Sequence, residues 1–275
     1  LVCLETLKVL DLAPTNLHAL TMPGPGTTDQ TKNNAHELAS SAGIELKEID
    51  INKAVDQHLT DLEHEGEHDV VYENSQARER TQILFDYANK IASIVVGTGD
   101  LSELALGWCT FNADQMSNYN VNVSIPKTMI AYLVDWYALN HAKPRLANIL
   151  KKVIATPISP ELVPPTNGKI SQKTEEIIGP YELHDFFLFH FLRHGATPSK
   201  IFKLAIIAFS AKYSENDIQG WLKIFFTRFF NQQFKRTTLP PGPKVGSVSL
   251  SPRGDWRMPD EASAKIYLDE IEHLI

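Results

Sequence analysis

The sequence predicts an α/β fold in which parallel strands are flanked by helices. Two apolar runs, at residues 17–22 and 94–97, are too short for independent helices and end at proline or glycine, as buried strands do. Residues 44–51 alternate apolar with polar side chains, which favours a third strand. Helix-forming stretches separate these runs, and this β-α-β order is typical of a parallel sheet.

Capping residues and helix breakers indicate where the helices lie. Thr27, Thr28 and Asp29 can cap a helix that continues to about residue 42, where Gly43 can close it. The other helices are expected at residues 1–12, 52–62, 72–92, 101–104, 125–141, 145–154, 181–194 and 217–233. Residues 156–172 and 234–256 are punctuated by proline and glycine, so both are expected to form loops.

Composition limits the class of protein. With 275 residues, of which 43% are hydrophobic and 21% charged, the chain can bury the core of one large globular domain, with or without a small extension. A net charge of −7 argues against a nucleic-acid surface as its main feature. The two cysteines, Cys3 and Cys109, support no disulfide framework, which fits a reducing cytoplasm. No apolar run reaches the length of a membrane span.

The stretch at residues 93–114 has the features of a ligand site. Thr98, between two glycines, follows the strand at residues 94–97, and open α/β sheets bind ligands at the carboxyl ends of their strands. Asp100 can cap the next helix, which places Glu103 in its first turn. A carboxylate there can hold a hard cation. An ordinary strand–turn–helix connection would have the same spacing, so the pattern alone leaves both interpretations open.

Other polar and aromatic clusters favour structural roles. His58, His64 and His68 lie in an acidic, glycine-containing stretch that is more typical of a surface loop than of a zinc motif. The phenylalanines at residues 181–192 indicate core or a subunit interface rather than a cofactor site. The basic residues at 235–257 could close over an anionic ligand, although a solvated tail is the simpler interpretation.

Three stretches are long and specific enough to resemble a known family. They are YENSQARERTQILFDYANK (72–90), VVGTGDLSELALGWCTFNADQMSNYNVN (95–122) and QQFKRTTLPPGPKVGSVSLSPRGDWRMP (232–259). Together they resemble the synthetase domain of bacterial glutamine-dependent NAD+ synthetases, in the N-type ATP pyrophosphatase superfamily. The resemblance implies a doubly wound parallel sheet flanked by helices, like that of adenine-nucleotide alpha hydrolases, with a helical and loop-rich C-terminal extension. It covers residues 1–275 and implies a nucleotide-binding part at 1–125 and a helical part with a substrate-closing tail at 126–275.

The reaction that the resemblance implies is the ATP-dependent amidation of nicotinic acid adenine dinucleotide to NAD+. The substrate carboxylate would attack the α-phosphate of ATP, release pyrophosphate and form an acyl-adenylate, from which ammonia would displace AMP. ATP is then a substrate and Mg2+ the metal cofactor. In full-length relatives an N-terminal glutaminase domain supplies the ammonia, and the family implies a homo-oligomer without nucleic-acid or membrane partners.

Two family features are absent from the sequence. The SGGxDS phosphate-binding loop, which should precede Leu1, is missing, and so is the glutaminase domain. The chain also starts without methionine, in residues typical of the middle of a helix, so we expect a fragment of a longer protein. Because that loop supplies backbone amides for pyrophosphate and an aspartate for magnesium, the fragment alone is expected to bind ATP poorly.

The resemblance also implies roles for individual residues, none of which is a nucleophile. It assigns contacts with ATP to Met22, Thr98 and Thr128, with Lys127 as a weaker candidate for phosphate. It assigns contacts with the deamidated dinucleotide to Asn74, Arg78, Glu103, Trp108, Cys109, Thr110, Phe111, Asp114 and Lys235. Glu103 is also the implied metal ligand.

Two other functions remain open at this point. The chain could be a catalytically silent module that binds a dinucleotide or serves assembly, because its phosphate loop is missing. It could also be an amidating member of the superfamily that acts on another acid, although GWCTF (107–111) and QQFKR (232–236) together favour NAD+ synthetases.

Overall fold

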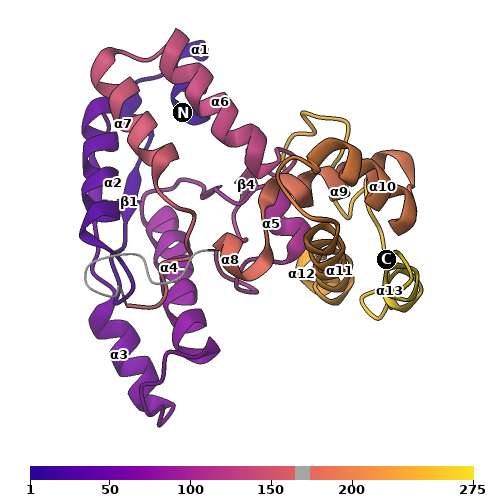
Figure 1. Cartoon of the computed structure of the whole chain (residues 1–275). Helices are drawn as coiled ribbons and strands as arrows, with labels where there is room; N and C mark the ends of the chain where they lie inside the picture. Colours follow the sequence, from indigo (N-terminus) through magenta and orange to yellow (C-terminus); the bar gives the residue numbers. More distant parts are fainter. Residues whose placement is uncertain (165–173) are drawn as a thin grey trace. The chain divides into compact units, whose positions relative to one another are not determined.

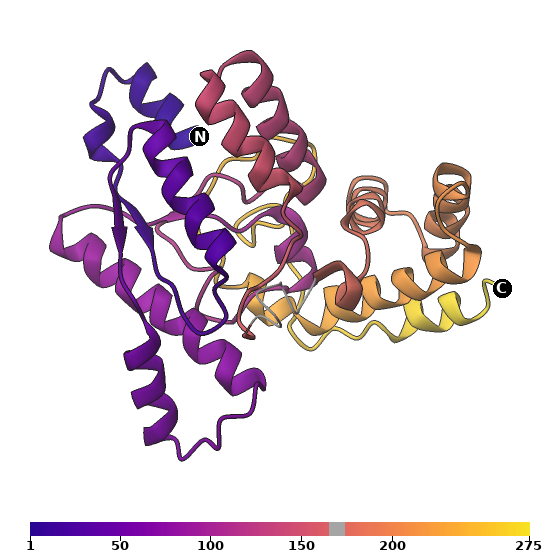
Figure 2. The same ribbon diagram turned by 60° about the vertical axis from the view of Figure 1, so that its left-hand side comes forward.

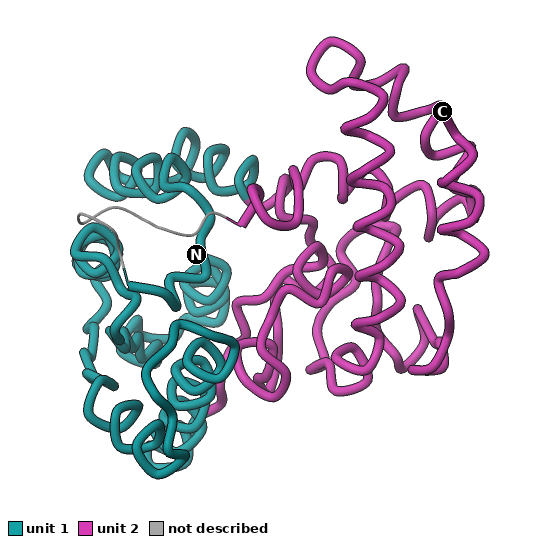
Figure 3. Tube along the Cα trace, turned by 60° about the horizontal axis from the view of Figure 1, so that its bottom comes forward, with its two compact units in different colours: residues 1–93, 131–173 teal, residues 94–130, 174–275 magenta. Residues whose placement is uncertain are grey.

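The computed structural model describes residues 1–164 and 174–275, which divide into two units (Figure 3). Unit 1 contains residues 1–93 and 131–173, and unit 2 contains residues 94–130 and 174–275. These units are defined by packing. The predicted division into a nucleotide-binding part at 1–125 and a helical part at 126–275 concerns function, and it stays a prediction. Part of the loop expected at residues 156–172 lies outside the described residues.

Unit 1 has parallel strands with helices beside them (Figure 1). Strand β1 (Ala19–Thr21) pairs with β2 (Leu46–Glu48), with Ala19 opposite Leu46. The other elements are α1 (Val2–Val9), the 3-10 turn η1 (Pro14–Asn16), α2 (Asp29–Ala42), α3 (Asn52–Asp61), α4 (Val70–Lys90) and α7 (Pro144–Ala155). Figure 2 shows α2 alongside both strands, and α2 also packs on α7.

The caps of α2 are those that the sequence predicts. The Thr28 hydroxyl accepts the Thr31 N–H at 3.2 Å, and Gly43 ends the helix in the left-handed conformation with φ 72°. The strands are shorter than predicted. Residues 44–51 form a strand only at Leu46–Glu48, because Ile51 leaves the strand to pack with Val55 and Leu59 in a small apolar core.

Unit 2 combines a short strand pair with a helical core. Strand β3 (Val96–Gly97) runs parallel to β4 (Tyr119–Asn120). The helices are α5 (Leu101–Leu106), the start of α6 (Lys127–Asn140), α8 (Thr174–Ile178), α9 (Tyr181–His194), α10 (Pro198–Phe209), α11 (Glu215–Asn231), α12 (Gln233–Arg236) and α13 (Lys265–Glu272). The boundary between the units falls within α6.

Aromatic side chains of α9 and α11 make the core of unit 2. Phe187, Phe225 and Phe229 have no exposed surface, and Phe191 meets Phe226 with ring centroids 5.1 Å apart. The prediction that the phenylalanines of residues 181–192 are core is therefore confirmed for Phe187 and Phe191. The prediction that the tail is loop from residue 234 onward was wrong in detail. Its first residues belong to the helical turn α12, in which Arg236 is buried.

No helix in the described part of the chain is long and apolar enough to cross a membrane. Cys3 and Cys109 are both free thiols.

His184 is a buried histidine in this core. Its imidazole is 1% exposed, and Nε2 lies 2.6 Å from the carbonyl oxygen of Ile178, to which the neutral ring donates. The ring lies beside Phe187 and Phe225. Burial lowers the pKa of His184 to about 4, despite the opposing effect of the Ile178 carbonyl. The imidazole is therefore neutral in the folded protein at neutral pH.

Acid is expected to destabilise the protein partly through His184. The folded-state pKa lies below the ordinary value of 6.5, so unfolding takes up a proton, and stability is lost as the pH falls from 6.5 to 4. The full effect is about 3 kcal/mol. We expect His184→Gln to flatten this part of the stability profile, measured by urea unfolding at several pH values. His273→Gln, at an exposed histidine, is the matched control, and an equally steep profile in both variants would contradict the prediction.

Candidate active site at the end of strand β3

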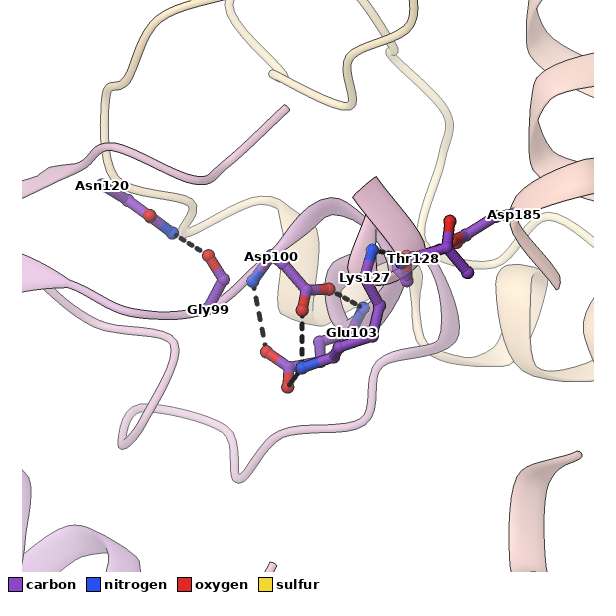
Figure 4. Close-up of polar contacts among 8 residues, drawn as sticks. Gly99, Asp100, Glu103, Asn120, Lys127, Thr128 and Asp185 are labelled. Carbon is purple, nitrogen blue, oxygen red and sulfur yellow. Dashed lines mark hydrogen bonds and ion pairs between the residues drawn. The ribbon is translucent and has the colours of Figure 1, made fainter. Parts of the chain in front are cut away.

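The turn after β3 is fixed by side chains from the β4 region. Gly97 is in close contact with them, since a Cβ at this position would lie 2.5 Å from the Ser117 hydroxyl and 3.0 Å from the Asn120 Cβ. The Asn120 amide donates to the Gly99 carbonyl at 2.9 Å (Figure 4). Thr98 is exposed between these glycines. The strand end therefore carries the exposed residue Thr98 on a backbone that Ser117 and Asn120 hold in place.

Helix α5 begins with a reciprocal capping box. The Asp100 carboxylate accepts the Glu103 N–H at 2.9 Å, and the Glu103 carboxylate accepts the Asp100 N–H at 3.2 Å. The prediction that Asp100 caps a helix with Glu103 in its first turn is confirmed. The cap brings two carboxylates together at the end of β3.

Lys127 completes this cluster. Its Nζ lies 2.5 Å from Glu103 Oε1 and 2.6 Å from Asp100 Oδ2 (Figure 4). The Asp100 side chain is only 1% exposed, while those of Lys127 and Glu103 are 20% and 24% exposed. One ammonium group thus serves two carboxylates, and the side chains of Lys127 and Glu103 remain partly exposed.

The charges shift the titration of both partners. Burial, and next the charge of Asp100, raise the pKa of Glu103 to about 7, against the lowering effect of Lys127. Burial lowers the pKa of Lys127, but the two carboxylates outweigh it, so its pKa is raised overall. A further cation beside Glu103 would lower the pKa of its carboxyl group, because a cation favours the ionised carboxylate.

The donors at this site fit a magnesium ion that shares its coordination with a substrate. Mg2+ is usually held by one or two carboxylates together with water and substrate phosphates. Of the two carboxylates here, Glu103 is the one that such an ion could reach, because the Asp100 side chain is 1% exposed. Within residues 1–164 and 174–275 no group of three or more histidines, cysteines and acids could hold a metal ion by itself, and His58, His64 and His68 form no such group. His64 instead lies 3.1 Å from Asp69, the cap of α4.

The residues after α5 bring aromatic and polar groups together. The guanidinium carbon of Arg228 lies 5.1 Å from the centroid of the half-buried Trp108 ring, and the Phe111 ring lies 5.4 Å from that of Phe234. The Thr110 N–H donates to the Asp114 carboxylate at 2.8 Å. A flat heterocycle could stack in such surroundings.

Cys109 belongs to the same stretch. Burial, and next the charge of Asp114, raise its pKa to about 12, so it is a thiol at neutral pH. A protonated thiol is a weak nucleophile, and the absence of a catalytic role for Cys109 stays a prediction.

Lys235 is held against this stretch by the backbone. Its Nζ donates to the carbonyl oxygens of Gly107 at 2.8 Å and Cys109 at 2.7 Å. Burial lowers its pKa. An ammonium group has three protons, so a fixed Lys235 retains one for an anionic ligand.

Three of the predicted site residues lie in unit 1. The carbonyl of Met22, a half-buried residue, accepts a hydrogen bond from Arg80 at 3.0 Å. Asn74 is half-buried and Arg78 exposed, both on α4. The other predicted residues belong to unit 2, which brings Glu103 together with Lys127 and brings Trp108, Cys109 and Lys235 together with one another.

Sequence reasoning missed three residues that organise this site: Asn120, Asp185 and Arg228. The only signal for Asp185 in the sequence was an acidic residue directly before the aromatic run FFLFHF. Asn120 and Arg228 act through contacts with residues distant in the sequence, for which no local spacing exists.

The fold and the cluster of Asp100, Glu103 and Lys127 together define an α/β protein with charged side chains gathered at the end of a parallel strand. A model of the NAD synthase family matches residues 2–232, so the chain belongs to this family. The glutamine-dependent NAD(+) synthetase of Mycobacterium leprae is 44% identical over 92% of this chain, and that of Mycobacterium tuberculosis matches equally well. The chain spans 41% of the length of these relatives.

Solved structures support the same fold. A glutamine-dependent NAD(+) synthetase from Cytophaga hutchinsonii has a TM-score of 0.75 at 19% identity and covers 92% of this chain, which in turn covers 40% of that protein. The NMN synthetase of Francisella tularensis has a TM-score of 0.52 at 22% identity, covering 72% of this chain and 75% of its own. The predicted fold class and the family resemblance are confirmed.

Proposed function

We propose that this chain is the amide-forming part of a glutamine-dependent NAD+ synthetase, a carbon–nitrogen ligase of NAD biosynthesis. The observation that carries the proposal is the cluster of Asp100, Glu103 and Lys127 at the end of β3, in a member of the NAD synthase family. The names of the mycobacterial relatives supply the substrate class.

The chemistry needs positioning and charge rather than a nucleophilic side chain. The nicotinate carboxylate of nicotinic acid adenine dinucleotide attacks the α-phosphorus of ATP, and the bond to pyrophosphate breaks. Ammonia then attacks the acyl carbon of the acyl-adenylate, AMP leaves with the electron pair of the broken C–O bond, and the nitrogen loses a proton. Mg2+ bound at Glu103 would offset the negative charge on the attacked phosphate.

The chain's own residues would bind and orient these substrates. We assign ATP contacts to Thr98, Met22 and Thr128. Asn74, Arg78, Glu103, Trp108, Cys109, Thr110, Phe111, Asp114 and Lys235 would contact the dinucleotide. The fixed ammonium groups of Lys127 and Lys235 add positive charge where phosphates and a carboxylate must approach one another.

The proposal extends to partners. Because the chain spans about two fifths of its mycobacterial relatives, the remaining length has room for a glutaminase domain that supplies the ammonia. We further propose a cytoplasmic homo-oligomer; the free thiols of Cys3 and Cys109 fit the reducing compartment.

The deciding experiment is NAD+ formation by the natural protein that contains this chain. With nicotinic acid adenine dinucleotide, ATP, Mg2+ and ammonium chloride, we expect one AMP and one pyrophosphate per NAD+. A protein that binds the dinucleotide without turnover would be a binding module instead. If another acid, such as nicotinic acid mononucleotide, were amidated in preference, the substrate assignment would be wrong.

A further inference from the structure

Asp185, on α9, uses one carboxylate oxygen to hold α5 and the other to hold the start of α6. Its Oδ1 accepts the hydroxyl of Ser102, a residue of α5. Its Oδ2 accepts the N–H of Thr128 at 3.1 Å and the Thr128 hydroxyl at 2.7 Å (Figure 4). The carboxylate therefore links three helices within unit 2.

Ser102 extends this network by one residue. Its oxygen accepts the N–H of Lys127 at 2.8 Å, and its hydroxyl donates a hydrogen bond to the Asp185 carboxylate. The first N–H groups of a helix have no partner within the helix. Ser102 and Asp185 thus satisfy those of Lys127 and Thr128, the first two residues of α6. Because Ser102 is 1% exposed, water cannot easily replace it.

This network fixes the backbone from which the Lys127 side chain extends. Lysine has a long stem with several rotatable bonds, so the place of its ammonium group depends on where its Cα is held. The Lys127 ammonium must reach Glu103 at 2.5 Å and Asp100 at 2.6 Å at the same time. Both of those acids belong to the cap of α5, and Ser102 lies between them in the sequence.

We propose that Asp185 is a positioning residue, which acts through Ser102 and the start of α6 to hold the ammonium group of Lys127 between Asp100 and Glu103. The proposal deepens the proposed function and rests on it for its catalytic consequence. The placement of Lys127 itself can be tested without turnover.

The first test is the chemical labelling of lysines in the natural full-length protein. A lysine whose ammonium group is held between two carboxylates and whose side chain is only 20% exposed reacts slowly with acetic anhydride, because the reagent reaches the nitrogen poorly. We expect Asp185→Asn to increase acetylation of Lys127 several-fold, read by mass spectrometry against exposed Lys223 as internal reference. An asparagine has one acceptor oxygen, so an amide N–H donor would replace a carboxylate oxygen on the side of either Ser102 or Thr128, and the hydrogen bonds would lose their charge.

Glu182→Gln is the matched control for this test. Glu182 is an acid on the same helix, but it pairs with Lys212 and Tyr213, outside the network. We expect its Lys127 labelling to equal that of the wild type. Unchanged labelling of Lys127 in Asp185→Asn would overturn the proposal, even if that variant melted at a lower temperature, since Asp185 would then be only a structural cap.

The second test asks whether Asp185 acts through Lys127 in catalysis. We expect Asp185→Asn to lower kcat for ammonium-dependent NAD+ formation ~10- to 100-fold, as misplacement of a functional group does. Lys127→Met should lower it at least as much, and the double variant should lose no more than Lys127→Met alone. Additive losses would overturn the proposal. A wild-type protein that makes no NAD+ would refute the proposed function, while the labelling result would still decide the position of Lys127.

Discussion

Replacing Glu103 by glutamine is expected to reduce ammonium-dependent NAD+ formation ~10³-fold in the natural protein, through loss of charge rather than of structure. A glutamine oxygen can still accept the Asp100 N–H, so the cap of α5 should survive. What is lost is the negative charge that balances Lys127 and fits a magnesium ion. The assay is NAD+ release at saturating ATP and dinucleotide, with the melting temperature recorded for each variant.

The chain offers a close control for this substitution. Asp217 occupies the same third position in the capping box of α11, where it accepts the Ser214 N–H at 3.2 Å. Asp217→Asn removes a charge from an equivalent cap in the same unit, and we expect activity within about twofold of wild type, as for an exposed surface site. If Glu103→Gln kept a tenth or more of the wild-type rate, Glu103 would be a capping residue alone.

The sequence predicted those parts of this site that depend on neighbours along the chain. Asp100 and Glu103 could be placed because a capping box spans four residues and has a recognisable composition. Lys127 lies 24 residues beyond Glu103, and Asp185 lies 83 beyond Ser102. Contacts over such separations depend on how helices pack, which leaves no repeat or spacing in the sequence. The family resemblance, rather than periodicity, identified Lys235.

The strands of unit 2 differ from the prediction for the same reason: their pairing depends on residues that are distant in the sequence. Strand β3 was expected at residues 94–97 but is limited to Val96–Gly97, and Ile94 is 63% exposed. Its partner β4 lies in the polar sequence SNYN, where no strand was expected. Asn120 is nevertheless 1% exposed, because its amide serves Gly99. A buried polar residue with a specific partner looks like a loop residue when only the sequence is considered.

Arg236 shows how far a residue's environment can differ from what its type suggests. The basic residues of the tail indicated either a solvated segment or one that closes over a ligand, yet Arg236 is 1% exposed. Its guanidinium donates to the carbonyls of Leu104 at 3.3 Å and Ala105 at 3.0 Å, and to that of Phe229. Burial lowers the pKa of Arg236 to about 9, which still leaves it charged at neutral pH.

Arg236→Met is therefore expected to destabilise the protein by about 3–5 kcal/mol. Leu104 and Ala105 lie in the last turn of α5, where carbonyls lack partners within the helix, and methionine can donate nothing to them. Arg236→Lys should recover only part of the loss, since one ammonium group cannot reproduce the planar fork of guanidinium donors. Urea unfolding followed by tryptophan fluorescence suits the measurement, because Trp108, Trp221 and Trp256 all belong to unit 2.

An exposed arginine with similar bonds separates burial from hydrogen bonding in this experiment. Arg257 also donates to two carbonyls, those of Pro252 and Arg253, but its side chain is exposed. Water can replace those bonds, so Arg257→Met should cost no more than about 0.5 kcal/mol. Equal losses in both methionine variants would show that the buried carbonyls of α5 find other partners. A large loss confined to Arg236 would mean that the helix carrying Glu103 is held at its far end by the tail of the chain.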